Sequence, residues 1–153
     1  MKEPKITALY ERTQEKDQFP EVRNSITTQK KQLEDYATTH GFGNIVHFTD
    51  DGVSGVLFGA DRPGFASMMS EIEIGNVGIC LCRDMTRLGR GFFPVGRCIE
   101  TMMVNGVRLI AINGDFDSNK DEDELRIFRG ILNMINANGK GSKQSRRQYH
   151  AEH

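Results

Sequence analysis

The sequence predicts a three-layer α/β domain, with a mainly parallel sheet of about four strands flanked by helices. Two observations predict this fold. Short apolar runs alternate with longer stretches whose apolar residues recur at helical spacing, which favours right-handed βαβ crossovers. The chain has 153 residues, of which 37% are hydrophobic and 27% charged, as is typical of one globular domain.

The first strand is predicted over residues 6–10, which are apolar enough to be buried in a parallel sheet. The polar stretch 11–23 has no periodicity and is predicted to be a loop. Ser25 then offers an N-cap to a helix that Gly41 and Gly43 would end. Its mixed apolar stripe at helical spacing consists of Ile26, Gln29, Leu33, Tyr36 and Ala37.

Three more strands are predicted further along the chain. The second strand, 45–48, leads to a helix that begins at Pro63, because proline suits the first helical position. The third strand is predicted over 77–82 and is followed by a helix over 94–105. The fourth strand is predicted over 107–112.

The last part of the chain is predicted to hold an acidic turn region, 115–124, and an amphipathic helix that includes Leu125. This helix is expected to end near Gly139, because a glycine costs about 1 kcal/mol in a helix interior. We therefore expect a folded domain over 1–137 and a short, polar, basic and disordered tail over 138–153.

Composition excludes several classes of function. The net charge of −1 gives no global basic field, so contact with nucleic acid would need local clusters of charge. Cys80, Cys82 and Cys98 fit core thiols better than a disulfide or zinc framework, so we expect no metal and no cofactor. The N-terminus lacks the apolar run of a signal peptide or membrane span, so a cytoplasmic protein without a membrane partner is expected.

Arginines are concentrated in two loops that follow predicted strands. The first loop, 50–65, contains Arg62, and the second, 83–90, contains Arg87 and Arg90. Loops at the carboxyl ends of parallel strands hold ligands in open α/β sheets. A guanidinium is always charged and binds two oxygens at once, so this pattern predicts a site for a phosphate.

An ordered set of motifs spanning residues 6–136 resembles the catalytic domain of serine site-specific recombinases, the resolvase and invertase family. The resemblance is greatest to the large members carried by transposons. The motifs are Tyr10-Glu11-Arg12, Asn24-Ser25-Ile26 through Gln29, Asp50-Asp51-Gly52-Val53-Ser54-Gly55, Arg62-Pro63-Gly64-Phe65, Asp84-Met85-Thr86-Arg87-Leu88-Gly89-Arg90, and Gly106-Val107-Arg108 leading into Ala111-Ile112-Asn113.

In this family a serine attacks a DNA phosphodiester to form a phosphoserine, and arginines neutralise the phosphate. The resemblance assigns the second role to Arg12, Arg62, Arg87 and Arg90. It also implies supporting roles for Gln29, Asp50, Asp51, Ser54 and Thr86. The implied partners are the phosphate backbone of DNA and other copies, as a homo-oligomer or a dimer with related recombinases. No metal is needed where arginines supply the charge.

The chain departs from the family at the nucleophile. The family pattern is Tyr-x-Arg-x-Ser, and Gln14 occupies the serine position. A carboxamide has no hydroxyl and cannot form the phosphoester. Thr13 carries a hydroxyl, but neighbouring side chains of a strand point to opposite faces, which turns Thr13 away from the side of Arg12. These residues predict a recombinase domain that no longer cleaves DNA.

Alternatives remain at this point. We expect the DNA-binding region of the family to be absent, which would fit a truncated remnant or a fragment of a longer protein. A non-catalytic remnant could dimerise with an intact recombinase and modulate it. An unrelated receiver-like domain would need an acidic pocket after the first strand, which residues 11–14 do not provide.

Overall fold

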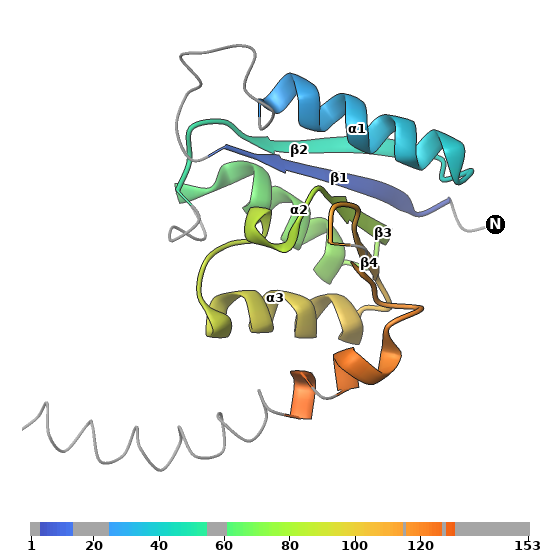
Figure 1. Ribbon diagram of the computed structural model, residues 1–153, viewed down its shortest axis with the longest axis vertical. Helices are drawn as coiled ribbons and strands as arrows, with labels where there is room; N and C mark the ends of the chain where they lie inside the picture. Colours follow the sequence, from blue (N-terminus) through green and yellow to red (C-terminus); the bar gives the residue numbers. More distant parts are fainter. Residues whose placement is uncertain (1–3, 14–24, 55–60, 115, 127, 131–153) are drawn as a thin grey trace, which may run out of the picture. The chain divides into compact units, whose positions relative to one another are not determined.

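The computed structural model describes residues 4–13, 25–54, 61–114, 116–126 and 128–130 (Figure 1). It divides into two compact units, Met1–Lys120 and Asp121–His153. The elements of the first unit are β1 (Ile6–Arg12), α1 (Ile26–Thr39), β2 (Ile45–Asp50), α2 (Pro63–Glu73), β3 (Val77–Cys82), the 3₁₀ turn η2 (Met85–Arg87), α3 (Phe92–Val104), β4 (Arg108–Ala111) and β5 (Phe116–Asp117). In the second unit, residues 122–126 and 128–130 are helical.

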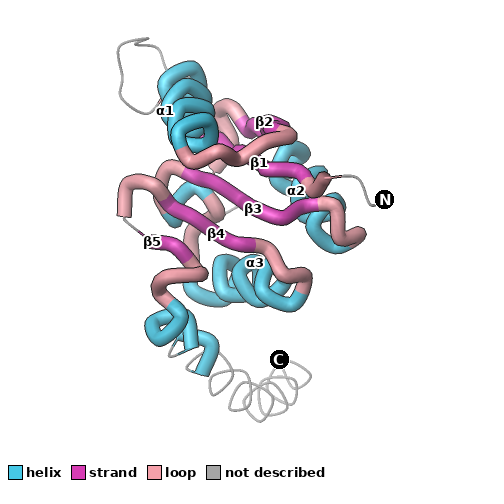
Figure 2. Tube along the Cα trace, turned by 90° about the vertical axis from the view of Figure 1, so that its right-hand side faces the viewer, coloured by secondary structure: helices cyan, strands magenta, loops and turns pink. Residues whose placement is uncertain are grey.

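The first unit is a sheet between helices. The strand order is β2-β1-β3-β4-β5, in which the first four strands are parallel and β5 is antiparallel to β4. Figure 2 shows α1 on one face of the sheet and α2 and α3 on the other. The predicted three-layer α/β fold is therefore confirmed.

Several boundaries agree with the sequence. Strand β3 covers the predicted range, and Ser25 caps α1 by accepting a hydrogen bond from the amide of Thr28 at 3.1 Å. Pro63 is the first residue of α2. Strands β1 and β2 each run two residues beyond the predicted end, to Arg12 and Asp50, which brings two predicted site residues into the sheet.

The prediction of about four strands was one short. The acidic region predicted as a turn contains β5, whose two residues are too few to show a strand period. Asp117 is held beside β4 because both carboxylate oxygens bind Arg108, at 3.0 and 2.7 Å. The predicted helix end near Gly139 and the tail 138–153 lie outside the described residues.

The side chains of β1 alternate between the two faces. Leu9 joins the core cluster on the α1 side, with Leu33 and Ala37. Tyr10 points to the opposite side, where its ring packs edge to face with the ring of Phe65 of α2. The two ring centres are 5.5 Å apart. The same alternation sends Glu11 towards α1 and Arg12 towards the side of α2.

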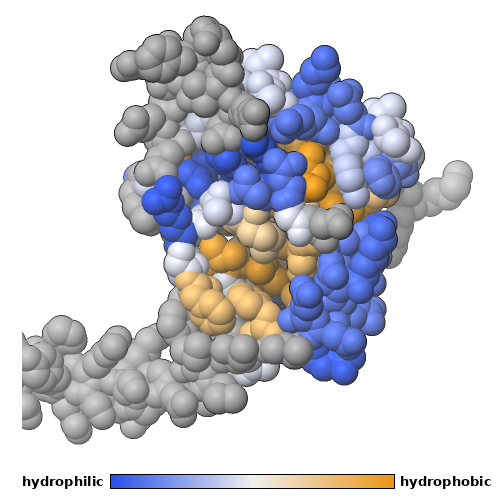
Figure 3. Space-filling model, viewed as in Figure 1, coloured by the Kyte–Doolittle hydropathy of each residue, from blue (hydrophilic) through white to orange (hydrophobic). Residues whose placement is uncertain are grey.

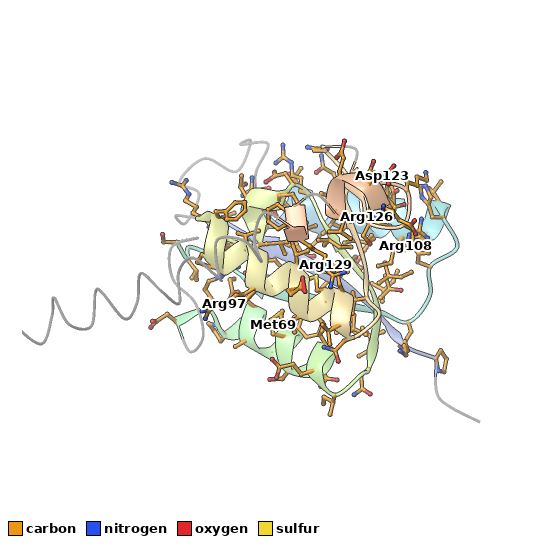
Figure 4. All side chains as sticks on the ribbon, turned by 90° about the horizontal axis from the view of Figure 1, so that it is seen from below. Met69, Arg97, Arg108, Asp123, Arg126 and Arg129 are labelled. Carbon is orange, nitrogen blue, oxygen red and sulfur yellow. The ribbon has the colours of Figure 1, made fainter. Side chains whose placement is uncertain are left out.

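The three cysteines are free and buried, as the sequence predicted. Met69 of α2, labelled in Figure 4, lies with its sulfur 3.9 Å from Cys98 Sγ of α3. Burial raises the pKa of the Cys98 thiol to about 12. The Cys98 thiol therefore packs between α2 and α3 and stays protonated.

The surface of the face seen in Figure 1 has hydrophobic residues gathered near its centre, between hydrophilic areas (Figure 3). Phe92, at the start of α3, is 41% exposed. Among the described residues, no helix combines the length and the apolar character needed to cross a membrane.

Candidate functional site

The carboxyl ends of β1, β2 and β3 bring the predicted arginines together. Arg12 ends β1 and pairs in register with Asp50, which ends β2. Strand β3 lies on the other side of β1 and leads into the loop that carries Arg87. The expectation that ligand-binding loops share this edge of the sheet is therefore met by the positions of the strand ends.

The Arg12 guanidinium is buried and binds only main-chain oxygens among the described residues. Its Nε donates to the carbonyl of Arg87 at 3.1 Å, and its Nη1 donates to the carbonyl of Val53 at 2.9 Å. Its Nη2 donates to the carbonyl of Thr86. Arg12 is 2% exposed, so water does little to screen its charge.

Arg62 is fully buried next to Arg12. Its Nη1 donates to the carbonyl of Leu88 at 2.8 Å, and its Nη2 donates to the carbonyl of Arg87 at 3.0 Å. The Arg87 carbonyl thus accepts from both Arg12 and Arg62. The guanidinium of Arg62 also lies over the ring of Phe65, with its carbon 4.1 Å from the ring centre.

Arg87 is the third arginine of the cluster, and its side chain donates to the main chain of Arg12. Its Nη1 donates to the carbonyl of Arg12 at 2.8 Å, and its Nε lies 3.4 Å from a carboxylate oxygen of Asp84. The main chain of η2 therefore holds two guanidiniums through its last carbonyls, which have no partner within so short a turn. Arg90 follows η2 and is exposed.

The electrostatics of the cluster are those of charges of like sign held close together. Burial lowers the pKa of Arg12, and the positive charge of Arg62 lowers it further. Arg87 and Arg90 act in the same direction. Carbonyl oxygens satisfy the N–H groups but carry no net charge, so they leave the charge of Arg12 uncompensated. Such a cluster can bind an anion, because buried charges are normally paired.

The predicted supporting residues fix the ends of the strands. Gln29 binds the main chain of Arg12 at both groups, accepting from its amide at 3.3 Å and donating to its carbonyl at 3.1 Å. Asp50 accepts from the amides of Gly64 and Phe65, at 2.8 and 2.9 Å, and so caps the start of α2. Gln29 thus holds the backbone of Arg12 and leaves its guanidinium to other partners.

The other supporting residues lie at the edge of the cluster. Thr86 contributes its carbonyl to Arg12, while its hydroxyl donates to Asp84. Ser54 is half-buried and follows Val53, whose carbonyl also binds Arg12. Asp51 is exposed and accepts a hydrogen bond from the hydroxyl of Thr13 at 2.7 Å.

The hydroxyl of Thr13 both donates and accepts a hydrogen bond within the loop after β2. Besides donating to Asp51, it accepts from the amide of Gly52 at 2.9 Å, and Thr13 is 3% exposed. A hydroxyl held in this way is poorly placed to attack a ligand. Gln14 lies outside the described residues, so its position at the site stays a prediction.

The sequence did not single out Tyr10 as a site residue. Its hydroxyl donates to Asp50 at 2.7 Å and accepts from Arg62 Nη2 at 2.8 Å. The available signal was its place two residues before Arg12, which puts both side chains on one face of a strand. Among the described residues, no group of three or more His, Cys, Asp or Glu side chains could hold a metal ion.

Comparison with known proteins places the chain in a family. The N-terminal domain of resolvases matches residues 8–151. The N-terminal catalytic domain of TP901-1 integrase is similar in structure, with a TM-score of 0.72 and 25% identity over 91% of this chain and 99% of that chain. A resolvase-family site-specific recombinase from Streptococcus pneumoniae has a TM-score of 0.68 and 23% identity over 97% and 99% of the two chains.

A serine recombinase from Sulfolobus solfataricus shares the fold, with a TM-score of 0.57 and 22% identity over 88% of this chain and 87% of that chain. No match was found among the curated proteins. The matched residues include both strands that carry Arg12 and Asp50 and the loop that carries Arg87. The chain therefore belongs to the resolvase family and contains its N-terminal domain.

Proposed function

We propose that this chain is a serine recombinase catalytic domain that binds the phosphate backbone of DNA but has lost the ability to cut it. The observation that carries the proposal is the buried arginine cluster. Arg12 and Arg62 both donate to the carbonyl of Arg87, and Arg87 donates to the carbonyl of Arg12. Among the described residues, no carboxylate binds the Arg12 guanidinium. Membership of the resolvase family supports the assignment of a DNA phosphate as the anion that this cluster binds.

The chemistry of the cluster favours a phosphate. Phosphoryl transfer depends on positioning and on stabilising charge on the equatorial oxygens, which several guanidiniums can do without a metal. Charge-assisted hydrogen bonds to a phosphate are about twice as strong as bonds between neutral groups, so a phosphate would compete well against the carbonyls. Arg90 is exposed and would be the first of the four arginines to meet DNA.

The lack of cleavage follows from the nucleophile position. Cleavage requires a hydroxyl oxygen to bond to phosphorus while its proton and the 3′ oxygen of the DNA leave. Gln14 offers only an amide at this position. Thr13 has a hydroxyl, but both of its hydrogen bonds hold the loop of Asp51 and Gly52. These contacts support the proposal that neither residue replaces the serine.

DNA binding by a charge-removing variant tests the proposal. We expect Arg90→Gln to weaken binding of duplex DNA and to reduce the slope of log affinity against log salt by about 1, because one phosphate contact is lost. Lys31→Gln is the matched control, since Lys31 is an exposed cation on α1, on the other face of the sheet. Equal losses for the two variants, or no DNA binding by the unmodified chain, would contradict the proposal.

A second candidate is favoured by Gln14, which leaves a folded domain without its nucleophile. In this case the chain associates with an intact relative and modulates it. Analytical ultracentrifugation of the chain mixed with a full-length serine recombinase would show a heavier complex. Separate sedimentation of the two proteins at all concentrations would exclude this role.

A further inference from the structure

The hydroxyl of Tyr10 lies between the carboxylate of Asp50 and the guanidinium of Arg62. It donates to Asp50 Oδ2 at 2.7 Å and accepts from Arg62 at both Nη2, 2.8 Å away, and Nε, 3.3 Å away. Tyr10 is fully buried, so no water competes for these bonds. A phenol has one O–H and two lone pairs, and here the proton faces the carboxylate and the lone pairs face the guanidinium.

Asp50, which binds the Tyr10 hydroxyl, is itself held by several hydrogen bonds. Its carboxylate caps α2 through the amides of Gly64 and Phe65, and its main chain accepts from the amide of Thr13 at 3.1 Å. The start of α2 is itself tight against β2, because a Cβ on Gly64 would lie 2.5 Å from the carbonyl oxygen of Thr49. Asp50 therefore has little freedom to move, and neither does the hydroxyl that it binds.

The guanidinium of Arg62 is fixed in two directions by this arrangement. One face lies over the ring of Phe65, at 4.1 Å, which sets the plane of the group. The edge formed by Nε and Nη2 donates to the Tyr10 oxygen, which together with the carbonyls of Leu88 and Arg87 sets the rotation of the group within that plane. Burial raises the pKa of Tyr10, and the hydrogen bond to Asp50 raises it further, so the hydroxyl keeps its proton.

We propose that Tyr10 is a positioning residue. Because its hydroxyl is bound to Asp50 and also accepts from Arg62, it holds the Arg62 guanidinium in the orientation that binds the phosphate. The inference rests on the proposed function, because it assigns the purpose of the orientation to phosphate binding. Tyr10 touches neither the phosphate nor the reacting atoms in this account. Its effect reaches the ligand through Arg62 alone.

The test compares Tyr10→Phe with Tyr36→Phe in the full chain. Both changes remove one phenol oxygen, but Tyr36 packs against the core cluster on the α1 side, away from Arg62. The ¹H–¹⁵N signals of the arginine Nε–H groups are followed during titration with inorganic phosphate, at ionic strength held constant with chloride. Arg62→Lys identifies the Arg62 signal by its disappearance. A third variant, Ile72→Val on α2, controls for loss of stability alone.

We expect the Arg62 signal of the unmodified chain to move on titration, and its Nε–H to exchange slowly with water. In Tyr10→Phe the exchange should accelerate and phosphate should bind about tenfold more weakly, as expected for the loss of a hydrogen bond to a charged group. Tyr36→Phe and Ile72→Val should leave both values unchanged. The same exchange rate and affinity in Tyr10→Phe as in the unmodified chain would overturn the inference.

The proposed function can fail separately. If phosphate moves no arginine signal in the unmodified chain, the proposed phosphate site is wrong, and with it the purpose assigned to Tyr10. The exchange rate of the Arg62 Nε–H in the free protein still decides whether Tyr10 orients the guanidinium. Slow exchange that survives in Tyr10→Phe would overturn that part as well.

Discussion

Glu11 and Arg12 are neighbours at the end of β1, and the sheet buries both charges with different kinds of partner. Glu11 is fully buried on the α1 side, where it accepts from His47 Nδ1 at 2.8 Å and from the hydroxyl of Thr49 at 2.8 Å. Arg12, on the other side, donates to three carbonyls. Glu11 contacts an opposite charge within the protein, whereas the Arg12 guanidinium contacts only neutral oxygens among the residues that the structure describes.

This difference indicates which of the two buried charges has its counter-charge inside the protein. His47 lies between two carboxylates, since its Nε2 is 2.5 Å from Glu34 of α1. Although burial alone would lower it, the pKa of His47 is raised by the hydrogen bonds to Glu11 and Glu34. Glu11 is therefore paired with a cationic imidazole inside the protein, and Glu34 contacts the same imidazole. Within the described part of the chain, no carboxylate binds the Arg12 guanidinium, and we infer that the arginine cluster binds an anion from outside the protein.

The largest expected effect comes from removing the partner of Glu11. We expect His47→Leu to lower the free energy of unfolding by about 3 kcal/mol, because it leaves a buried carboxylate without its cation. Urea denaturation measures this change. The double variant Glu11→Leu/His47→Leu should recover most of the loss, since an apolar pair often replaces a buried ion pair at little cost. A double variant no more stable than the single one would show that Glu11 is not balanced by His47.

The next effect concerns the other side of β1. Inorganic phosphate at ten times its dissociation constant should raise the stability of the unmodified chain by about 1.4 kcal/mol, because it binds only the folded state. Thermal unfolding in phosphate and in chloride of equal ionic strength measures the difference. Arg12→Gln should lose this stabilisation, whereas Lys31→Gln should keep it. Stabilisation of Arg12→Gln equal to that of the unmodified chain would place the anion elsewhere.

The smallest effect is a dependence of stability on pH. The pKa of His47 is raised in the folded state, so its contribution is complete below about pH 6.5 and is lost as the pH rises through the folded value. Burial likewise raises the pKa of Glu11, so the folding stability also falls as the pH rises through the titration of Glu11, at lower pH than for His47. For His47 we expect the free energy of unfolding to fall by less than about 1 kcal/mol over this range, since water reaches part of the ring. His47→Gln should remove the upper step, and an unchanged profile would contradict the assignment.

The fold could be predicted where a local signal sets it. Ser25 and Pro63 mark helix starts by their own chemistry, and residues 77–82 form an apolar run of strand length. Strand β5 could not be predicted, because its two residues are held by pairing with β4 and by the bond of Asp117 to Arg108. Such contacts depend on tertiary structure and leave no period in the sequence.

The site was predictable to the level of its strands and loops. The rule that ligands bind at the carboxyl ends of parallel strands was enough to bring Arg12, Arg62 and Arg87 together. The bonds of Tyr10 and the partners of Glu11 depend on register, such as the pairing of Leu9 with His47 and of Glu11 with Thr49. The sequence does not specify that register. The structure places Arg12, Arg62 and Arg87 together, but their roles towards phosphate, like those of Gln14 and Arg90, remain predictions.

We propose that an intact phosphate site has lost its nucleophile at Gln14. The decisive experiment is to look for covalent protein–DNA adducts on a denaturing gel. The chain would be joined to the DNA-binding region of a close relative and assayed as Gln14, as Gln14→Ser and as Gln14→Ser/Arg12→Gln. The same fusion with the relative's own catalytic domain is the positive control.

We expect an adduct from Gln14→Ser and none from the Gln14 chain or the double variant. An adduct from the Gln14 chain would contradict the loss of cleavage and direct attention to Thr13. No adduct from Gln14→Ser, when the positive control forms one, would contradict the claim that the arginine site is intact.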